Sequence, residues 1–350
     1  MSEGQALTNF SPSPVSSEPD PILQDLAGQL LPSSRRIYRH DAQAFAAWML
    51  AQGLTPQSLE KSHVVAYRAY LQDHYAKATA RRMLSVARQL LAEQVERKQI
   101  ASNPASGVRG FKGEDETPHV ALKEDQAQAL LDAIDITTLS GLRDYVLILF
   151  LLRTGIRRSE AAALTWADLK MREGHHVAFI EHGKGDKRRV VKVPVEVFRE
   201  LEGYREALRQ YHQQRATYQL EELADEQSTL DKDTYQAQWQ AIIDQHTMSA
   251  DDALFVRIRR GEHATLAGIS DRSIATIVEY YAEKAGIEDL SPHGLRASFI
   301  TLTLEAGASL HQVQYAAGHS DPRTTERYQK RKLNLDNNAV DRLHFVKRRS

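Results

Sequence analysis

The chain has 350 residues, with 45 Lys or Arg, 46 Asp or Glu and no cysteine, so its formal net charge is −1 at pH 7. This length allows two domains with separate hydrophobic cores, and the lack of cysteine excludes thiol catalysis, disulfides and cysteine-based zinc sites. Because no run of about 18 apolar residues occurs, and no basic segment followed by an apolar one opens the chain, we expect neither a membrane span nor a signal peptide.

Residues 1–32 are expected to form a disordered tail. The segment contains acids but no Lys or Arg, and serine alternates with proline from Ser11 to Pro14. Such a composition offers little apolar surface to bury, and its prolines interrupt regular structure.

Residues 33–112 are expected to form a helical bundle. The opening segment has apolar residues at positions that suit one buried helix face, namely Ile37, Phe45, Trp48 and Met49. Further amphipathic segments cover about residues 59–73 and 78–98. Asn103 and Pro104 then end the bundle.

The near-zero net charge conceals two segments of opposite sign. Residues 33–113 contain thirteen basic and five acidic side chains, a net charge of +8. Residues 200–252 contain four basic and twelve acidic side chains, a net charge of −8. The simplest arrangement has the basic segment facing the phosphates of a nucleic acid and the acidic segment facing away.

Basic side chains in two regions are candidates for DNA contact through phosphates or base edges in the major groove. The candidates near the starts of two predicted helices are Arg35, Arg36, Arg39, Arg81 and Arg82. The candidates in a later predicted turn are Lys187 and Arg188. Arg189 and Lys192 add positive charge beside that turn. The alternative that these charges only solvate helix surfaces stays open.

Residues 113–119 have the composition of a linker, and a second domain is expected over residues 120–335. It begins with a helix at 122–134, followed by an apolar helix at 142–153. That helix leads into the sequence Thr154-Gly155-Ile156-Arg157-Arg158-Ser159-Glu160.

Two strands, 177–180 and 190–193, are expected to pair around a turn that contains Lys184. The following segment, about 201–250, is acidic and helical in composition. A two-helix hairpin is the simplest interpretation, but a coiled projection, a protein-interaction arm or an element-specific insert is also compatible with it.

Three motifs follow near the end of the chain. They are Pro292-His293-Gly294-Leu295-Arg296, Ala317-Gly318-His319-Ser320 and Thr324-Thr325-Glu326-Arg327-Tyr328. An apolar pattern continues from Leu333 into the terminal segment 336–350, which either folds back on its own domain or packs into a neighbouring subunit.

These residue types suit the cleavage of a phosphodiester. Attack on phosphorus places negative charge on the two non-bridging oxygens, which fixed cations and hydrogen-bond donors must meet. Arg157 and Arg296 can each grip two phosphate oxygens. His293 and His319 can donate hydrogen bonds or move protons near neutral pH.

The remaining two residues supply a proton and a nucleophile. Lys184, at the tip of the predicted hairpin, could protonate the departing 5′ oxygen, and Tyr328 could form a covalent phosphotyrosine. Nothing in this set requires a metal. No phosphate-cradling Gly-x-x-x-x-Gly-Lys-Ser/Thr loop occurs, so neither magnesium nor ATP is implied.

Each signal has an ordinary structural explanation when it stands alone. Tyr328 by itself suits a half-buried core residue, the Gly-Lys-Gly sequence around Lys184 suits a turn, and Arg157 could simply pair with Glu160 at the start of a helix. The order and spacing of the whole set favour catalysis, since His319 lies 23 positions after Arg296 and Tyr328 lies nine positions after His319.

The set resembles the tyrosine recombinase family, which includes phage integrases, Xer recombinases and Cre, over roughly residues 33–335. The resemblance implies a helical core-binding bundle followed by a mainly α catalytic domain with a small antiparallel β-sheet. It implies that Arg157 and Arg296 clamp the phosphate, that Lys184 is the general acid and that Tyr328 is the nucleophile. It further implies that His293 and His319 are the two histidines of the family pattern and that Glu160 supports the active site. Departures from the pattern are Ala297, where many Xer-like members have a second histidine, and Ala317, which replaces a common leucine.

The resemblance further implies a site-specific recombinase that works through a 3′-phosphotyrosine and a Holliday junction without a cofactor. Its implied partners are double-stranded DNA with paired inverted binding sites and three further copies of the chain, in a homotetramer on two DNA sites. Its implied location is the cytoplasm, on the DNA of a prokaryote, phage or mobile element.

Two alternatives from other classes stay open. A type IB topoisomerase uses similar residues to relax supercoils, and a catalytically silent DNA-binding regulator would keep the fold. Among recombinases, the absence of a clear arm-binding domain ahead of Ser33 favours a two-domain enzyme of Xer or Cre type over a lambda-like integrase.

Overall fold

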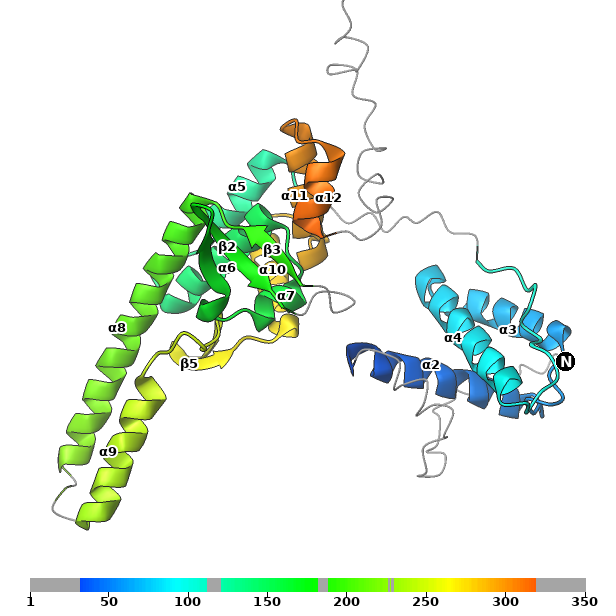
Figure 1. Ribbon diagram of the computed structural model, residues 1–350, viewed down its shortest axis with the longest axis horizontal. Coiled ribbons are helices and arrows are strands. Elements are labelled where there is room, and N and C mark those ends of the chain that lie inside the picture. The colour runs from blue at the N-terminus through cyan, green and yellow to red at the C-terminus, as the bar shows by residue number, and fades with distance from the viewer. Residues whose placement is uncertain (1–31, 112–120, 182–187, 226, 228–229, 319–350) are drawn as a thin grey trace, which may run out of the picture. The chain divides into compact units, whose positions relative to one another are not determined.

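The computed structural model describes residues 32–111, 121–181, 188–225, 227 and 230–318 (Figure 1). The chain divides into two compact units, one within residues 1–117 and the other within residues 118–350. This division falls inside the segment 113–119 that the sequence suggests as a linker. The predicted amino-terminal tail and the carboxy-terminal segment 336–350 lie outside the described residues.

Within residues 32–111, the first unit contains the helices α2 (Pro32–Ala51), α3 (Lys61–His74) and α4 (Lys77–Glu96). Their apolar residues recur every three or four positions, so each helix turns one stripe toward a shared core. The largest fully buried side chains of this core are Phe45, Tyr67, Leu71, Met83, Leu84 and Leu91. The rings of Phe45 and Tyr67, 4.8 Å apart between centroids, join α2 to α3.

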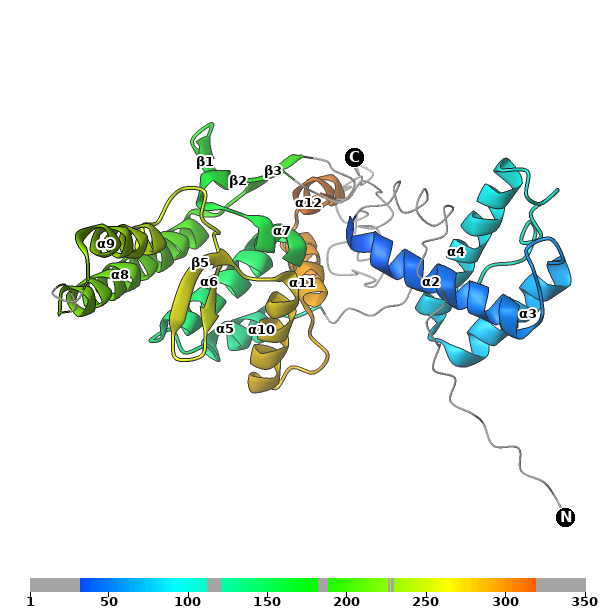
Figure 2. The ribbon, with the colours of Figure 1, turned by 90° about the horizontal axis from the view of Figure 1, so that it is seen from below.

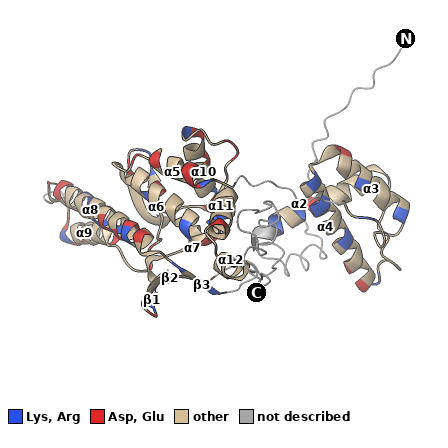
Figure 3. Cartoon of the chain, turned by 90° about the horizontal axis from the view of Figure 1, so that it is seen from above, with Lys and Arg blue, Asp and Glu red and all other residues tan. Residues whose placement is uncertain are grey.

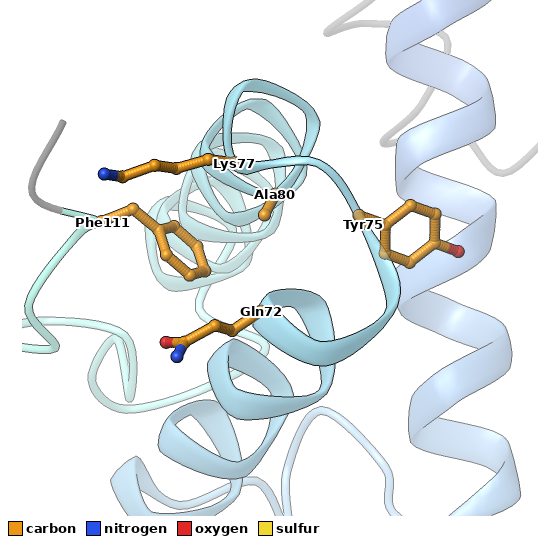
Figure 4. A pocket seen from close by; sticks show the side chains of 5 residues that line it. All are labelled: Gln72, Tyr75, Lys77, Ala80 and Phe111. Carbon is orange, nitrogen blue, oxygen red and sulfur yellow. The ribbon is translucent and has the colours of Figure 1, made fainter. Parts of the chain in front are cut away.

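A pocket opens beside the turn that joins α3 to α4. It is lined by Gln72, Tyr75, Lys77, Ala80 and Phe111 (Figure 4). The Arg68 guanidinium lies over the Phe111 ring, 4.5 Å from its centroid, so a cation–π contact holds this ring in the wall of the pocket. None of the lining residues belongs to the predicted catalytic or DNA-contact sets.

The second unit is mainly helical and has its own core around α6. Its shorter helices are α5 (Glu124–Asp132), α6 (Leu139–Thr154), α7 (Arg158–Ala163), α10 (Asp271–Lys284), α11 (Pro292–Glu305) and α12 (Leu310–Ala317). Every residue of α6 from Val146 to Leu152 is buried, because α5, α8 and α11 all contact this helix. Of the helices in the described part of the chain, none is both long and apolar enough to cross a membrane.

Two small antiparallel sheets complete the second unit. The first has the order β1 (Leu169–Arg172), β2 (His175–Ile180), β3 (Arg189–Lys192), with Val177 opposite Lys192 and Ile180 opposite Arg189. This pairing confirms the predicted hairpin, and the mixed architecture confirms the predicted fold class. The second sheet, β4 (Val256–Arg259) with β5 (His263–Gly268), was not anticipated from the sequence.

The acidic segment forms a two-helix hairpin of α8 (Val195–Asp225) and α9 (Lys232–His246), which lie side by side in both views (Figures 1 and 2). The first turns of α8 belong to the main core, since Leu201, Tyr204 and Leu208 are fully buried there. Beyond Leu208, the hydroxyl of Tyr211 accepts the N–H of Ala264 on β5. The projecting part therefore begins later than the predicted start of the insertion at residue 201. By contrast, α9 has no buried residue.

Two histidines join the helices of this hairpin. His212 on α8 and His246 on α9 approach at 3.0 Å between their Nδ1 atoms, and the Nε2 of His246 lies 2.9 Å from the Oε1 of Gln219. The Gln219 oxygen can only accept, so His246 carries its proton on Nε2 and accepts from the Nδ1–H of His212. The Nε2 of His212 is then a bare acceptor, buried without a partner among the described residues.

The stability of the hairpin is expected to fall in acid because His212 must stay neutral. Burial, together with the neighbouring His246, lowers the pKa of His212 from 6.5 to about 4. The unfolded chain therefore binds more protons than the folded chain as the pH falls from 6.5 toward 4, and folding stability decreases over that window. Since one pKa unit corresponds to about 1.4 kcal/mol, the loss approaches about 3 kcal/mol.

Thermal melts of wild type and His212→Gln from pH 7.5 to pH 4 measure this effect. We expect the variant to lose less stability than wild type over that range. His311→Gln, at an exposed position on α12, controls for the loss of an imidazole as such. Parallel curves for wild type and His212→Gln would contradict the prediction.

Candidate active site

The Arg157 motif begins where α6 stops. Gly155 ends α6 with φ = 62° and donates its N–H to the carbonyl of Leu151. A Cβ at this position would lie 2.2 Å from the Phe299 ring of α11, so only glycine permits both the left-handed turn and the close approach of α11. Ile156 then enters the core, and Arg157 becomes the residue that precedes α7.

Glu160 accepts four hydrogen bonds from two arginines. The backbone N–H of Arg157 donates to its Oε2 at 2.7 Å, and the Nη1 of Arg157 donates to its Oε1 at 2.8 Å. From β3, the Nη1 and Nη2 of Arg189 donate to Oε1 and Oε2, each at 2.7 Å. These bonds use the full accepting capacity of the carboxylate and cap the start of α7.

The carboxylate is buried and stays ionised. Its side chain is 2% exposed, compared with 15% for Arg189 and 27% for Arg157. Burial alone would raise the pKa of Glu160, but the hydrogen bonds and charges of Arg189 and Arg157 outweigh it and lower the pKa to about 2. Glu160 is therefore a permanent anion in the working pH range.

Arg296 reaches the same region from α11. It is 3% exposed, and its Nη1 and Nη2 donate to the carbonyls of Gly155 and Ala317. Arg157 donates through Nη2 to the next carbonyl along, that of Gly318, at 3.4 Å. The two arginines thus converge on the carboxy-terminal end of α12, although 139 positions separate them in the sequence.

His293 and Arg296 lie on the same helix at the i and i+3 positions, which places them on one face of α11. Ser291 accepts from the N–H of Gly294 and begins this helix, and His293 in its first turn is exposed. Ala297, where many Xer-like proteins have a second histidine, is fully buried. This helix therefore offers one exposed histidine and one buried arginine to the site.

The other three predicted catalytic residues, Lys184, His319 and Tyr328, lie outside the described residues. Their flanks are described: β2 ends at Ile180 and β3 begins at Arg189. The helix α12 ends at Ala317 and is capped by Gly318, which precedes His319 in the sequence. Their catalytic roles stay predictions.

Arg189 is the site residue that the sequence analysis missed. Its only signal was positive charge beside a turn, and the 29 positions between Glu160 and Arg189 exceed any local pairing rule. The structure assigns it the same carboxylate partner as Arg157.

The first unit carries five of the predicted DNA-contact arginines, and Figure 3 shows the basic residues on its helices and the acidic residues along α8 and α9. Arg35, Arg36 and Arg39 are exposed on α2. Arg82 has a partner within the protein, because its Nε and Nη2 donate at 2.7 and 3.1 Å to the fully buried Asp41. The Arg82 side chain is still 46% exposed, so its DNA contact stays a prediction alongside an internal role.

Two further predicted contacts, Lys187 and Arg188, lie between β2 and β3 in the sequence. Arg188 is 81% exposed and lies 2.9 Å from Glu181, whereas Lys187 lies outside the described residues. Within the described part of the chain, no group of three or more His, Asp or Glu side chains is arranged to hold a metal ion.

Comparison with known proteins is consistent with this arrangement. A family model described as "Phage integrase family" matches residues 121–334. Tyrosine recombinase XerD of Shewanella oneidensis is 30% identical over 313 residues, which cover 88% of this chain and 90% of that protein.

Solved structures with the same fold include two recombinase–DNA complexes. The XerH site-specific recombinase bound to palindromic difH substrate, in a post-cleavage complex, has a TM-score of 0.62 at 18% identity, with 88% of this chain and 80% of that chain covered. A lambda integrase tetramer bound to a Holliday junction has a TM-score of 0.58 at 14% identity, with 88% and 74% covered.

Removing the partner of the buried Asp41 is expected to cost stability. Arg82→Gln would leave a buried carboxylate without its bidentate donor, which we expect to destabilise the first unit by about 2 kcal/mol, less than for a fully buried pair because Arg82 is half-exposed. Arg39→Gln, an exposed change on α2, should alter stability by less than about 0.5 kcal/mol.

Chemical denaturation of the two variants, together with DNA binding well below their melting temperatures, separates folding from contact. If Arg82→Gln kept wild-type stability and lost only DNA affinity, the Asp41 pair would not be its main role.

Proposed function

The chain belongs to the phage integrase family and is a tyrosine recombinase, and from this premise we propose that it cleaves and rejoins double-stranded DNA at specific sites with the six motif residues named above. The observation that carries the proposal is the convergence of Arg157 and Arg296 on the end of α12, where they donate to the carbonyls of Gly318 and Ala317. These are the two residues that precede His319 in the sequence. Residues from three distant motifs are thereby gathered around one position. A single phosphate bound there would meet both guanidinium groups.

The proposed reaction begins with attack of the Tyr328 hydroxyl oxygen on the scissile phosphorus, and the hydroxyl proton passes to water. A phosphotyrosine bond forms at the 3′ side, the bond to the 5′ oxygen breaks, and Lys184 supplies the proton that this oxygen takes up. Arg157 and Arg296 meet the charge that builds on the non-bridging oxygens, with hydrogen bonds from His293 and His319. The freed 5′ hydroxyl then attacks the phosphotyrosine of the partner duplex, which rejoins DNA and releases Tyr328.

The proposed assembly is a homotetramer on two duplexes, each with paired inverted sites. The lambda integrase tetramer on a Holliday junction and the XerH complex on a palindromic substrate support this proposal by fold similarity. Two rounds of strand exchange would pass through such a junction. A relative of the chain, tyrosine recombinase XerD of Shewanella oneidensis, comes from a bacterium, so we assign the reaction to cytoplasmic DNA.

Covalent trapping tests the nucleophile. Nicked suicide duplexes, tiled from the DNA that flanks the gene, are incubated without metal with wild type or Tyr328→Phe. We expect a protein–DNA band that resists SDS with wild type alone, because only the tyrosine oxygen can form the phosphotyrosine. The variant should bind the same duplex as tightly as wild type.

The outcome also discriminates between enzyme classes. An adduct of equal yield with Tyr328→Phe would exclude this residue as the nucleophile. Relaxation of supercoiled plasmid with no adduct on any flanking duplex would favour a topoisomerase over a recombinase.

Loss of either clamp arginine is expected to slow the chemical step. Arg157→Ala and Arg296→Ala should each reduce the single-turnover rate of adduct formation on the order of a hundredfold or more, because charge stabilisation in the transition state is lost. Rates measured at saturating protein separate this effect from weaker binding. Thermal melts of both variants exclude unfolding as the cause, and wild-type rates in folded variants would refute the assigned roles.

A further inference from the structure

We propose that Arg189 is a positioning residue of the active site, which neutralises Glu160 so that the Arg157 guanidinium keeps its positive charge available for the phosphate. The inference rests on the proposed function, because it concerns the same phosphate site. It assigns a role to a residue that neither the motifs nor the resemblance singled out.

The charges of the cluster give the first reason. Arg157 and Glu160 alone would form a neutral ion pair, and a neutral pair stabilises an approaching anion poorly. With Arg189 the described cluster contains two cations and one anion, a net charge of +1. Because the Glu160 carboxylate is only 2% exposed, water does not screen its negative charge.

The geometry gives the second reason. Arg189 binds both oxygens of Glu160 side-on, each at 2.7 Å, and so fixes the orientation of the carboxylate that in turn holds the N–H and Nη1 of Arg157. A lysine could contact the carboxylate but could not reproduce this fork. Arg189 on β3 therefore fixes, through Glu160, the position of Arg157, which precedes α7.

The packing against α12 gives the third reason. A Cβ at Gly318 would lie 2.6 Å from the Arg189 Nε, and Gly318 has φ = 66°. The Arg189 side chain thus lies directly against the residue before His319, while its Nε is buried without a hydrogen-bond partner in the described residues. One side chain contacts the glutamate of the Arg157 motif and the glycine of the Gly-His-Ser motif. It extends from β3, the strand that follows Lys184 in the sequence.

The first test compares cleavage rates of folded variants on a nicked duplex that traps wild type. Arg189→Gln should form adduct at least about tenfold more slowly, with a nearly unchanged dissociation constant for the duplex, because the loss falls on the transition state. Arg189→Lys should recover part of the rate, since it restores the charge without the fork. The matched control is Arg172→Gln on β1, where an arginine side chain is 56% exposed beside an exposed Glu173, and it should cleave as wild type does.

The dependence of the cleavage rate on pH distinguishes this positioning role from a purely structural role. Arg189 and Arg157 are the charged groups that hold the pKa of Glu160 at about 2. Without Arg189, burial would raise that pKa, so the cleavage rate of Arg189→Gln should begin to fall at a higher pH than that of wild type as the solution is acidified. Because Arg189 acts through Glu160, the double variant Glu160→Gln/Arg189→Gln should be no slower than Glu160→Gln alone.

Failure of this inference can be distinguished from failure of the proposed function. If wild type and Arg189→Gln cleave at the same rate and lose activity at the same acid pH, the inference is wrong and the proposed function is unaffected. If wild type forms no adduct, the proposed function is wrong. The role of Arg189 is then tested by amide hydrogen exchange of the DNA-free protein. We expect faster exchange at the amides of residues 157–161 in Arg189→Gln but not in Arg172→Gln, and unchanged exchange would overturn the inference.

Discussion

The buried carboxylate of Glu160 is the interaction on which the arrangement of the site depends. An ionised group removed from water is costly unless every lone pair is satisfied, and here four donors from Arg157 and Arg189 satisfy it. To supply those donors, the turn after α6, the start of α7 and the strand β3 must hold fixed positions. A single burial requirement thereby joins segments that local structure alone would leave independent.

The fold of the second unit meets this requirement through close contacts at glycines and helix ends. Gly155 lets α6 end against the Phe299 ring, and Gly318 lets α12 end against Arg189. Arg296 connects the same two helix ends through the carbonyls of Gly155 and Ala317. Helix termini leave carbonyl groups without intrahelical partners, so the arginine stabilises both ends while it lies at the site.

The helix α8 belongs both to the core of the second unit and to the acidic hairpin that it forms with α9. The first turns of α8 bury Tyr204 and Leu208 in the catalytic core, whereas its later turns pack mainly on α9. The buried His212 marks the boundary region, where a chain of hydrogen bonds through His246 to Gln219 links the two helices. The acidic composition of residues 200–252 offsets the positive charge of residues 33–113, so the whole chain has almost no net charge.

The sequence by itself determined α2 to α6, the hairpin of α8 and α9, the pairing of β2 with β3 and the family, because periodicity and motif spacing act between near neighbours. It offered the pairing of Arg157 with Glu160 as one explanation among others, and it did not indicate α10, α11 or α12. Only the tertiary structure decided the partners separated by long stretches of chain: Arg189 with Glu160, Arg82 with Asp41, and Arg296 with Gly155. It also decided that the core includes the first turns of α8 and that β4 pairs with β5. Such contacts depend on how packed elements bring side chains together, and an arginine that reaches a buried carboxylate has the same local sequence signal as one that faces solvent or DNA.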